Sequence, residues 1–411
     1  MKSISLLLLS TFTALADFDW QTQSWPSQPA TGLQALDQKP TERKLIIEGN
    51  KTPFAKDGKY HRVRVPVAAL SKSGTLIVAS EGRLGANPDH PPGTDRDWDH
   101  VLISRSTDMG KTWTTSIIDD GKNKLDVGAL SICSDKKSGK LFVLAYAANQ
   151  GGKVLIYQSS DDGLTWTQHH QSGTTFTGGP LQQAFRMRPT NGIQLSPLHG
   201  PSADIILPGV IGYSKNRMMG LLRYQNAQDA WTLTTTFENV TDPQLAGEMT
   251  VAELDGPQAG KLYFITRPES KIHGKMKSHL THTLGTKPAP PEAWSDSAFS
   301  FKRCNQNLAR YSFKEFHNKS RLIFSSTKNL TGKRLGGHIS VSYNNGHTWK
   351  SRAIVSDQEQ FGYSQILPLP DGTIAVIYEG QNAAGQATTA LYFKRASMAW
   401  ITQGADAGLV K

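Results

Sequence analysis

The stretch SSDDGLTW at Ser159–Trp166 is one of three copies of the template Ser-x-Asp/Asn-x-Gly-x-Thr-Trp. The other copies are STDMGKTW at 106–113 and SYNNGHTW at 342–349, and a degenerate fourth, YQNAQDAW at 224–231, keeps only the Asn and the Trp. The four Trp positions are separated by 53, 65 and 118 residues, and 118 is twice 59. A recurring period of this size is typical of a repeat array or a propeller.

An apolar segment precedes each copy, for example Val154–Tyr157 before the second, and another strand is expected after the Trp. The central Asp, Asn and Gly suit a tight turn, because Gly adopts positive φ and Asp or Asn bonds back to the backbone. The Trp can then fold beneath the hairpin into the space between two sheets. We call the copies boxes, and we interpret their acidic residues as structural and not as catalytic.

Short strands with Gly, Asn and Asp turns fill the chain between the boxes, and no long helical period interrupts them. From about Lys56 to Trp400 there is room for six repeat units. The sequence therefore predicts an all-β fold, a six-bladed β-propeller of four-stranded antiparallel blades. Residues 46–411 are assigned to this propeller, and residues 17–45, rich in Gln, Pro, Ser and Thr, to a lead-in segment.

The first sixteen residues have the pattern of a secretory signal. A basic start at Lys2 is followed by an apolar run from Ile4 to Leu15, with small residues up to Ala16. The run is too short, and too often interrupted by Ser and Thr, to span a bilayer, and such a segment is typical of a cleavable signal peptide. No later stretch is apolar enough to span a membrane. We therefore expect a secreted protein, extracellular or periplasmic, after cleavage near Ala16.

The net charge limits the kinds of partner that are expected, and the two cysteines limit the number of disulfides. The formal net charge is +11, which falls by one when Lys2 leaves with the signal, and a basic balance suits an anionic partner. The Lys and Arg residues are scattered, without a zinc-finger or recognition-helix pattern, so nucleic acid is not the expected partner. No metal-ligand cluster is evident, and a monomer is expected. Cys133 and Cys304, the only cysteines, are interpreted as two buried thiols or as one disulfide.

Four arginines stand at the ends of expected strands in different repeats. Arg64 lies in the run YHRVRVP at 60–66, Arg83 ends the following strand, Arg267 closes LYFITR, and Arg334 lies eight residues ahead of the third box. This combination resembles the exo-α-sialidase (neuraminidase) family with aspartate-box repeats. The resemblance covers nearly the whole mature chain, and it implies the same propeller.

The resemblance implies an enzyme that hydrolyses terminal α-linked sialic acids from glycoconjugates with retention of configuration, and that needs no cofactor. Arg64, Arg267 and Arg334 match the three positions of the family's carboxylate clamp. Guanidinium groups bind carboxylates in a bidentate manner and keep their charge, which suits a substrate with a carboxylate on its anomeric carbon. Arg62 lies on the same strand face as Arg64 and is the local rival, but no Val-Pro follows it.

A tyrosine nucleophile is expected, because the substrate's own carboxylate would repel a carboxylate nucleophile. Tyr363, in the segment FGYS at 361–364, matches the family's nucleophile. A phenol needs a base to remove its proton near neutral pH, and Glu248, in GEMTVAEL at 247–254, matches that base. Glu253 is the rival and is expected to make a structural contact.

The remaining site residues orient a partner or move a proton. Glu379, at the end of a later strand, matches the carboxylate that orients Arg64, and Arg83 matches an additional substrate-binding arginine. The acid/base is expected on the Gly- and Pro-rich loop 85–99, where Asp89 lies six residues after Arg83 in the family's register. The same loop holds three rival carboxylates, Asp95, Asp97 and Asp99.

Two other functions are compatible with the same pattern. A non-catalytic sialoglycan-binding propeller would keep the boxes, but the complete set of site residues argues against it. A trans-sialidase, or a variant that prefers deaminated sialic acid, would share the core residues, so these residues alone do not separate it from a hydrolase.

Overall fold

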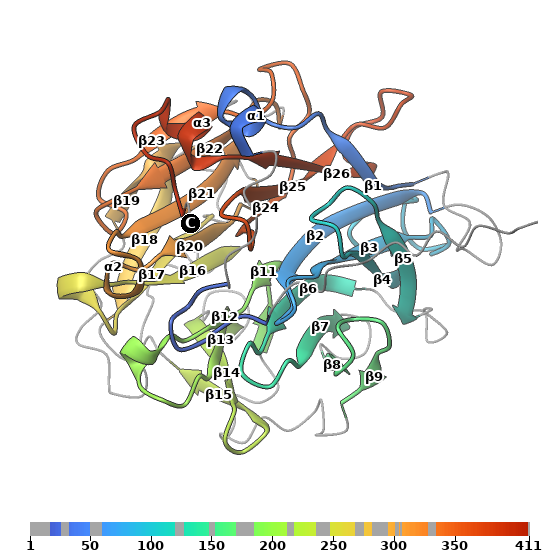
Figure 1. Cartoon of the computed structure of the whole chain (residues 1–411). Coiled ribbons are helices and arrows are strands. Elements are labelled where there is room, and N and C mark those ends of the chain that lie inside the picture. Colours follow the sequence, from blue (N-terminus) through green and yellow to red (C-terminus); the bar gives the residue numbers. More distant parts are fainter. Residues whose placement is uncertain are drawn as a thin grey trace, which may run out of the picture.

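The computed structural model describes residues 17–25, 33–49, 60–119, 127–147, 153–169, 185–211, 218–235, 247–267, 275–281, 295–300, 304, 306–327 and 334–409. The predicted signal peptide, 1–16, lies outside the described residues. Within them the protein is mostly β, and small sheets are arranged around a common centre in a propeller-like manner (Figure 1). The predicted all-β class is therefore confirmed.

The described strands form six sheets. The first contains β2 (Arg62–Leu70), β3 (Leu76–Arg83), β4 (Asp99–Ser106) and β5 (Thr114–Asp119). The second contains β11 (Thr190–Asn191), β6 (Val127–Ser134), β7 (Leu141–Ala147), β8 (Lys153–Ser159) and β9 (Thr167–Gln168). The third contains β10 (Phe185–Met187), β12 (Ile193–Gln194), β13 (Ile205–Ile211), β14 (Met218–Gln225) and β15 (Ala230–Thr235).

The other three sheets have four strands each. The fourth contains β16 (Met249–Glu253), β17 (Leu262–Thr266), β18 (Lys275–Thr281) and β19 (Ser295–Ser300). The fifth contains β20 (Leu308–Ser312), β21 (Arg321–Thr327), β22 (Gly337–Ser342) and β23 (Lys350–Ala353). The sixth contains β1 (Lys44–Glu48), β26 (Ala390–Ala396), β25 (Ile374–Gly380) and β24 (Ser364–Pro368).

Two sheets depart from the four-stranded antiparallel pattern that the sequence predicts. β11 adds to the second sheet as a parallel neighbour of β6, and the third sheet gains β12 beside β13. These short strands come from one segment, 190–194, which therefore bonds to two neighbouring sheets. The prediction of four antiparallel strands in every sheet is wrong for these two.

The sixth sheet takes its outer strand from the N-terminal region, because β1 pairs antiparallel with β26. The expected boundary at 45/46 falls inside this strand. The described part of the chain also has three short α-helices, α1 (Leu33–Gln38), α2 (Lys314–His317) and α3 (Met398–Thr402). None of the helices in that part is long and apolar enough to cross a membrane.

The three boxes form the same turn, between β4 and β5, β8 and β9, and β22 and β23. In the second box the Ser159 hydroxyl accepts from the Gly163 amide at 3.0 Å, and the Trp166 indole donates to the Gly163 carbonyl at 3.1 Å. Asp161 accepts from the backbone amide and the hydroxyl of Thr165. Gly163 has φ of 80°, which glycine adopts without steric cost. The acidic side chain is thus used within its own turn.

The boxes also hold neighbouring sheets together. Gly110 of the first box packs on Phe393 of β26, and a Cβ at Gly110 would lie 2.1 Å from that ring. Trp113 of the same box has its ring 5.6 Å from Phe393 in an edge-on arrangement. Aromatic pairs of this kind contribute beyond the area they bury. The first box therefore joins the first sheet to the sixth.

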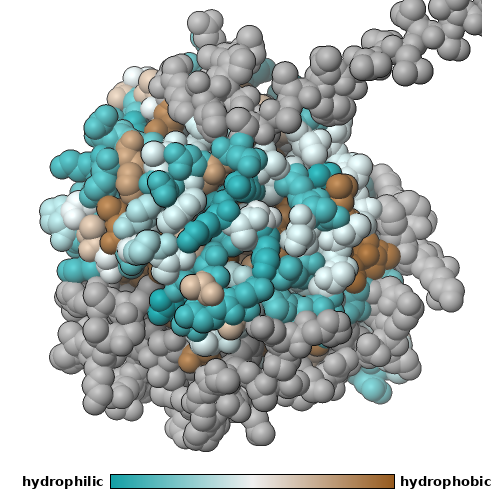
Figure 2. Space-filling model, turned by 60° about the horizontal axis from the view of Figure 1, so that its bottom comes forward, coloured by the Kyte–Doolittle hydropathy of each residue, from teal (hydrophilic) through white to brown (hydrophobic). Residues whose placement is uncertain are grey.

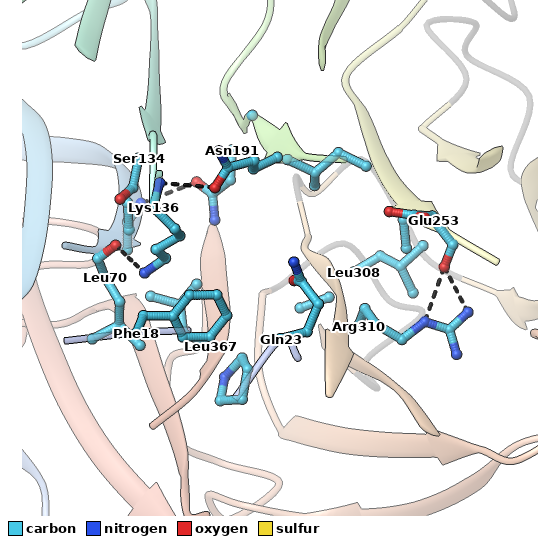
Figure 3. Close-up of a pocket in the computed structure, with 18 of the residues that line it drawn as sticks. Phe18, Gln23, Leu70, Ser134, Lys136, Asn191, Glu253, Leu308, Arg310 and Leu367 are labelled. Atoms are coloured by element: carbon cyan, nitrogen blue, oxygen red, sulfur yellow. Dashed lines mark hydrogen bonds between the residues drawn. The ribbon is translucent and has the colours of Figure 1, made fainter. Parts of the chain in front are cut away.

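The first strands of the sheets contact one another around the centre of the molecule. β2 contacts β6 and β24, and β20 contacts β16 and β24. Arg64 lies near the start of β2, and Tyr363 immediately precedes β24. Leu70 and Leu367, near the ends of the same strands, line a cavity of about 200 Å³ together with Phe18 (Figure 3). Phe18, from the N-terminal segment, therefore lies near the ends of β2 and β24 that are opposite to Arg64 and Tyr363.

Candidate active site

Tyr363 is buried immediately before β24 and contacts two of the predicted site residues. Its hydroxyl donates a hydrogen bond to the Glu248 carboxylate and accepts one from Arg267 Nη1 at 2.9 Å. Glu248 precedes β16, Arg267 follows β17, and the antiparallel pairing of these strands brings the two residues together. The Arg267 amide donates to the Glu248 carbonyl at 2.7 Å. The predicted nucleophile, base and one clamp arginine therefore meet.

Two further arginines lie over the ring of Tyr363. The guanidinium carbons of Arg64 and Arg334 are 5.5 and 4.9 Å from the ring centroid, within the range of cation–π contacts. Arg267 has a buried Nε without a hydrogen-bond partner among the described residues. A buried donor without a partner costs free energy, so an acceptor that bound here would offset this cost. The three predicted clamp arginines surround one phenol.

Glu379 is fully buried on β25 and anchors the site. Its Oε1 accepts from Arg64 Nε and from the Val65 amide, both at 2.8 Å. Its Oε2 accepts from Arg64 Nη2 at 3.2 Å and from the Tyr363 amide at 3.1 Å, and lies 3.7 Å from Arg334 Nη1. Val65 has φ of 54°, which a β-branched residue rarely adopts. The Glu379 carboxylate therefore holds strained backbone as well as two arginines.

Burial sets the protonation states around the phenol. Burial and the neighbouring Glu248 raise the pKa of Tyr363, although three arginines act to lower it. Tyr363 is therefore a neutral phenol near neutral pH. Burial also acts to raise the pKa of Glu379, but Arg64 and then Arg334 outweigh it and hold that pKa below its ordinary value. Glu379 is thus a carboxylate.

Arg83 ends β3 in a buried position and holds the loop 85–99. Its Nη2 donates to Glu81 Oε2 at 2.7 Å, and its Nη1 donates to the Gly93 carbonyl at 3.1 Å. The same Nη1 lies 2.8 Å from Asp95 Oδ1. Arg83 therefore connects the first sheet to two points of the loop.

Two of the four loop carboxylates are buried and structural. Asp97 accepts from the amides of Ala86 at 3.1 Å and Gly93 at 2.8 Å, among other backbone donors of the loop. Asp99 accepts from the Val127 amide at 3.0 Å. Both side chains are oriented toward backbone amides, so they organise the loop and its junction with the second sheet.

The other two loop carboxylates, Asp89 and Asp95, are exposed. The amide of Asp89 donates to Asn87 Oδ1 at 3.1 Å, and the Asp89 carboxylate bonds to no arginine in the described part of the chain. Asp95 is paired with Arg83, and although desolvation acts to raise its pKa, Arg83 and neighbouring arginines lower it below the ordinary value. The structure therefore does not bring Asp89 into contact with the cluster around Tyr363.

Glu253, the rival to Glu248, lies at the other end of β16. Its carboxylate accepts from the Ser196 amide at 2.8 Å and is 2.7 Å from His199 Nδ1. Its backbone carbonyl accepts two hydrogen bonds from Arg310, and Figure 3 shows this pair beside the cavity that Phe18, Leu70 and Leu367 line. The side chain of Glu253 makes structural contacts, as expected from the sequence.

Cys304 and Glu81 lie beside site residues, although the sequence did not assign either of them to the site. Cys304 packs against Val65 and Tyr363, and burial raises the pKa of its thiol to about 11. Cys133 and Cys304 are both buried and free, so of the two interpretations of the cysteines the thiols hold. The sequence feature that could have identified Glu81 is its position two residues before Arg83, because residues at this spacing lie on the same face of a strand.

The described surface on the face seen in Figure 2 is mostly hydrophilic. Hydrophilic residues cover most of the described surface there, and hydrophobic residues occur in small scattered groups. Large exposed hydrophobic side chains in the described residues are Leu45 and Leu164. A broad apolar patch of the kind that marks a docking surface is not seen on the described part of that face.

The fold and the site together define a propeller-like β-protein in which three arginines surround a Tyr–Glu pair. A curated sialidase of Bacteroides fragilis (strain YCH46) is 23% identical over 365 residues, 80% of this chain and 62% of that protein. A sialidase of Micromonospora viridifaciens is 23% identical over 388 residues, 86% of this chain and 55% of that protein. The solved structure of a leech intramolecular trans-sialidase matches with a TM-score of 0.63 and 15% identity, over 89% of this chain and 71% of the other.

These similarities to proteins named sialidase support a sialidase family for this chain. The family resemblance found in the sequence is thereby confirmed. No protein-family model matches the sequence. The chain spans 62% and 55% of the lengths of the two curated relatives.

Proposed function

We propose that this protein is an exo-α-sialidase, which hydrolyses terminal α-linked sialic acids from glycoconjugates with retention of configuration. One observation carries the proposal: the Tyr363 hydroxyl bonds to both Glu248 and Arg267. A phenol beside a base and beneath cationic groups is the arrangement that attack on a carboxylate-bearing sugar requires. Similarity to proteins named sialidase supports the substrate class. A glycan-binding module would have no need of the contact between the phenol and the base.

In the first half-reaction Arg64, Arg267 and Arg334 bind the substrate carboxylate and bring the anomeric carbon to Tyr363. The phenolic oxygen attacks that carbon while Glu248 accepts the phenolic proton. The bond between the anomeric carbon and the leaving oxygen breaks, and the leaving oxygen takes a proton from the acid on the loop 85–99. The result is a covalent sialyl–tyrosine intermediate and a free aglycone.

In the second half-reaction water attacks the same carbon from the face that the aglycone has left. The deprotonated acid of the loop accepts the proton of this water, and Glu248 returns its proton to the Tyr363 oxygen as that bond breaks. Two displacements at one carbon give net retention. Transfer in place of hydrolysis follows when a sugar hydroxyl replaces water in this step.

Asp89 is proposed as the acid/base, and Asp95 as the residue that fixes the loop to Arg83. A general acid must be protonated when the leaving group departs. The pairing of Asp95 with Arg83 at 2.8 Å and its lowered pKa favour the carboxylate form. Asp89 has no such partner among the described residues, and its position on an exposed loop suits a residue that meets the aglycone.

Several finer features of the molecule belong to the same proposal. Residues 1–16 are removed on export, and the enzyme acts outside the cytoplasm on sialylated glycans as a monomer. Its six sheets are the six blades of one closed ring, joined between β1 and β26. N-terminal sequencing of the exported protein and its mass in solution test cleavage and oligomeric state.

The wild-type protein is expected to release the fluorophore from a fluorogenic α-sialoside between about pH 4 and pH 8. The first-formed sugar should be the α-anomer, observed by proton NMR before it equilibrates. The absence of release at every pH in this range would support the glycan-binding module instead. An anhydro sugar or a new sialoside as the main product would identify a transferase.

Asp89→Asn is expected to lower kcat/KM for an unactivated sialyl oligosaccharide by about 100-fold or more. The loss should be far smaller for a fluorogenic sialoside, because a good leaving group departs without a proton. Asp95→Asn is the matched control on the same loop, and its effect should be similar for the two substrates. A leaving-group dependence found for Asp95→Asn and not for Asp89→Asn would reverse the two roles.

A further inference from the structure

Arg62 is a half-buried arginine beside the clamp that the proposed reaction does not use. It begins β2, two positions before Arg64, and residues at this spacing on a strand are about 6.6 Å apart. In the ladder between β2 and β3, Arg62 lies directly opposite Arg83. Like charges in directly opposite positions destabilise an antiparallel pair. The arrangement therefore has a cost in stability that the structure of the first sheet alone does not explain.

The carboxylates near Arg62 are paired with other cations. Glu379 is bonded to Arg64, and Asp95 to Arg83. Within the described part of the chain, no hydrogen bond or ion pair joins the Arg62 guanidinium to another side chain. Burial, followed by Arg64 and Arg83, lowers the pKa of Arg62, as expected where positive charge is in excess. An anion bound here would offset that excess.

A pocket of about 380 Å³ opens beside Arg62, lined by His61, Arg62 and residues 386–389. Residues 386–389 belong to the hairpin between β25 and β26, so the pocket lies between the first and sixth sheets. Glu379 lies near the end of β25 that leads into this hairpin and bonds to Arg64, so the pocket lies at the same end of the sheets as the clamp. Thr388 has φ of 54°, an unfavourable conformation for a residue other than glycine, retained at the pocket rim.

The loop 85–99 packs directly on the two basic residues of this pocket. A Cβ at Gly93 would lie 3.1 Å from two side-chain carbons of Arg62 and 2.6 Å from His61 Nδ1. In the proposed reaction this loop supplies the acid that protonates the leaving oxygen. Arg62 is therefore on the side of the site toward which the leaving sugar departs.

We propose that Arg62 and this pocket form an anion subsite for the sugar adjoining the scissile bond, so that preferred substrates carry a second acidic group on that sugar. A guanidinium binds carboxylates and sulfates through two parallel hydrogen bonds. Two glycan groups provide this chemistry, the carboxylate of an inner sialic acid and a sulfate ester. The inference rests on the proposed function, because it defines the leaving side of the same site.

Three oligosaccharides with one common core test the subsite: a monosialyl form, its disialyl counterpart, and the monosialyl form with a sulfate on the adjoining sugar. The wild type should have a higher kcat/KM for the disialyl form, the sulfated form or both than for the plain form. Added salt should narrow the preference. Arg62→Gln should lower the ratio of acidic to plain substrate by about tenfold. Comparison of the disialyl and sulfated arms identifies the source of the acidic group.

Arg96→Gln is the matched control, because it removes one positive charge from an exposed position on the loop 85–99, outside the pocket. Its ratio of acidic to plain substrate should stay within about twofold of the wild type. An unchanged ratio in Arg62→Gln, or an equal change in both variants, would overturn the subsite. If the wild type cleaves none of the three, the proposed function fails. Calorimetric titration of Tyr363→Phe, and of the Arg62→Gln, Tyr363→Phe double variant, with the same three oligosaccharides then tests the subsite without turnover.

Discussion

Replacing Tyr363 by Phe is expected to lower kcat/KM for a sialoside by at least about 1,000-fold. The substitution removes the oxygen that attacks the anomeric carbon, and Glu248 loses the proton that it accepts. The ring itself is retained, so Arg64 and Arg334 keep the aromatic face that they cover. Far-UV circular dichroism and the melting temperature should therefore stay close to those of the wild type. The initial rate of fluorophore release measures the effect.

Tyr157→Phe is the matched control for this loss. Tyr157 is also buried, and its hydroxyl also donates to a carboxylate, that of Asp119, between the first and second sheets. The same atom is deleted next to the same kind of partner, away from the clamp. Activity should change by less than about twofold, with a small loss of stability of about 1 kcal/mol. Normal turnover by Tyr363→Phe, or an equal loss in both variants, would contradict a tyrosine nucleophile.

Local sequence patterns predicted the turns and strands well, because both depend on nearby residues. The apolar segment Val154–Tyr157, expected before the second box, lies within β8, Lys153–Ser159. The strand ends two residues beyond the apolar segment. Pairing with β7 on one side and β9 on the other extends it, and such pairing leaves no local signal. β11 escaped prediction for the same reason, since a two-residue parallel strand is defined by its partner alone.

The candidate site likewise depends on contacts between distant residues, which local sequence patterns do not predict. Tyr363 and Glu248 lie 115 residues apart in sequence, and only the resemblance to a known family could pair them beforehand. The contacts of Cys304 with Val65 and Tyr363 come from packing across sheets, which no spacing rule encodes. Gly362 is also explained by the structure alone, because a Cβ there would lie 2.5 Å from Glu379 Oε2.

Glu379→Gln is expected to destabilise the protein by about 3–5 kcal/mol and to abolish most sialidase activity. The carboxylate accepts hydrogen bonds from Arg64, the Val65 amide and the Tyr363 amide. Glutamine keeps the shape but removes the charge, and it directs an amide NH₂ toward one of these donors. Arg64 then stays buried without its counter-ion, and the removal of one partner of a buried pair is more costly than the loss of both. Denaturant unfolding measures the change.

Glu253→Gln provides the comparison, because Glu253 is equally buried but bonds to Ser196 and His199 and not to an arginine side chain. The free energy of unfolding should fall by about 1–3 kcal/mol, with turnover largely retained.

The dependence of stability on pH provides a further test of the Glu379 carboxylate. Because the pKa of Glu379 is lowered in the folded state, the stability it contributes is present above the unfolded pKa of about 4.3. That stability is lost as the pH falls through the folded pKa, so the difference between wild type and Glu379→Gln should be constant near neutral pH and shrink only in acid. A difference that shrinks instead as the pH rises from 6 to 8 would show that the Glu379 carboxylate is not the anchor of the clamp.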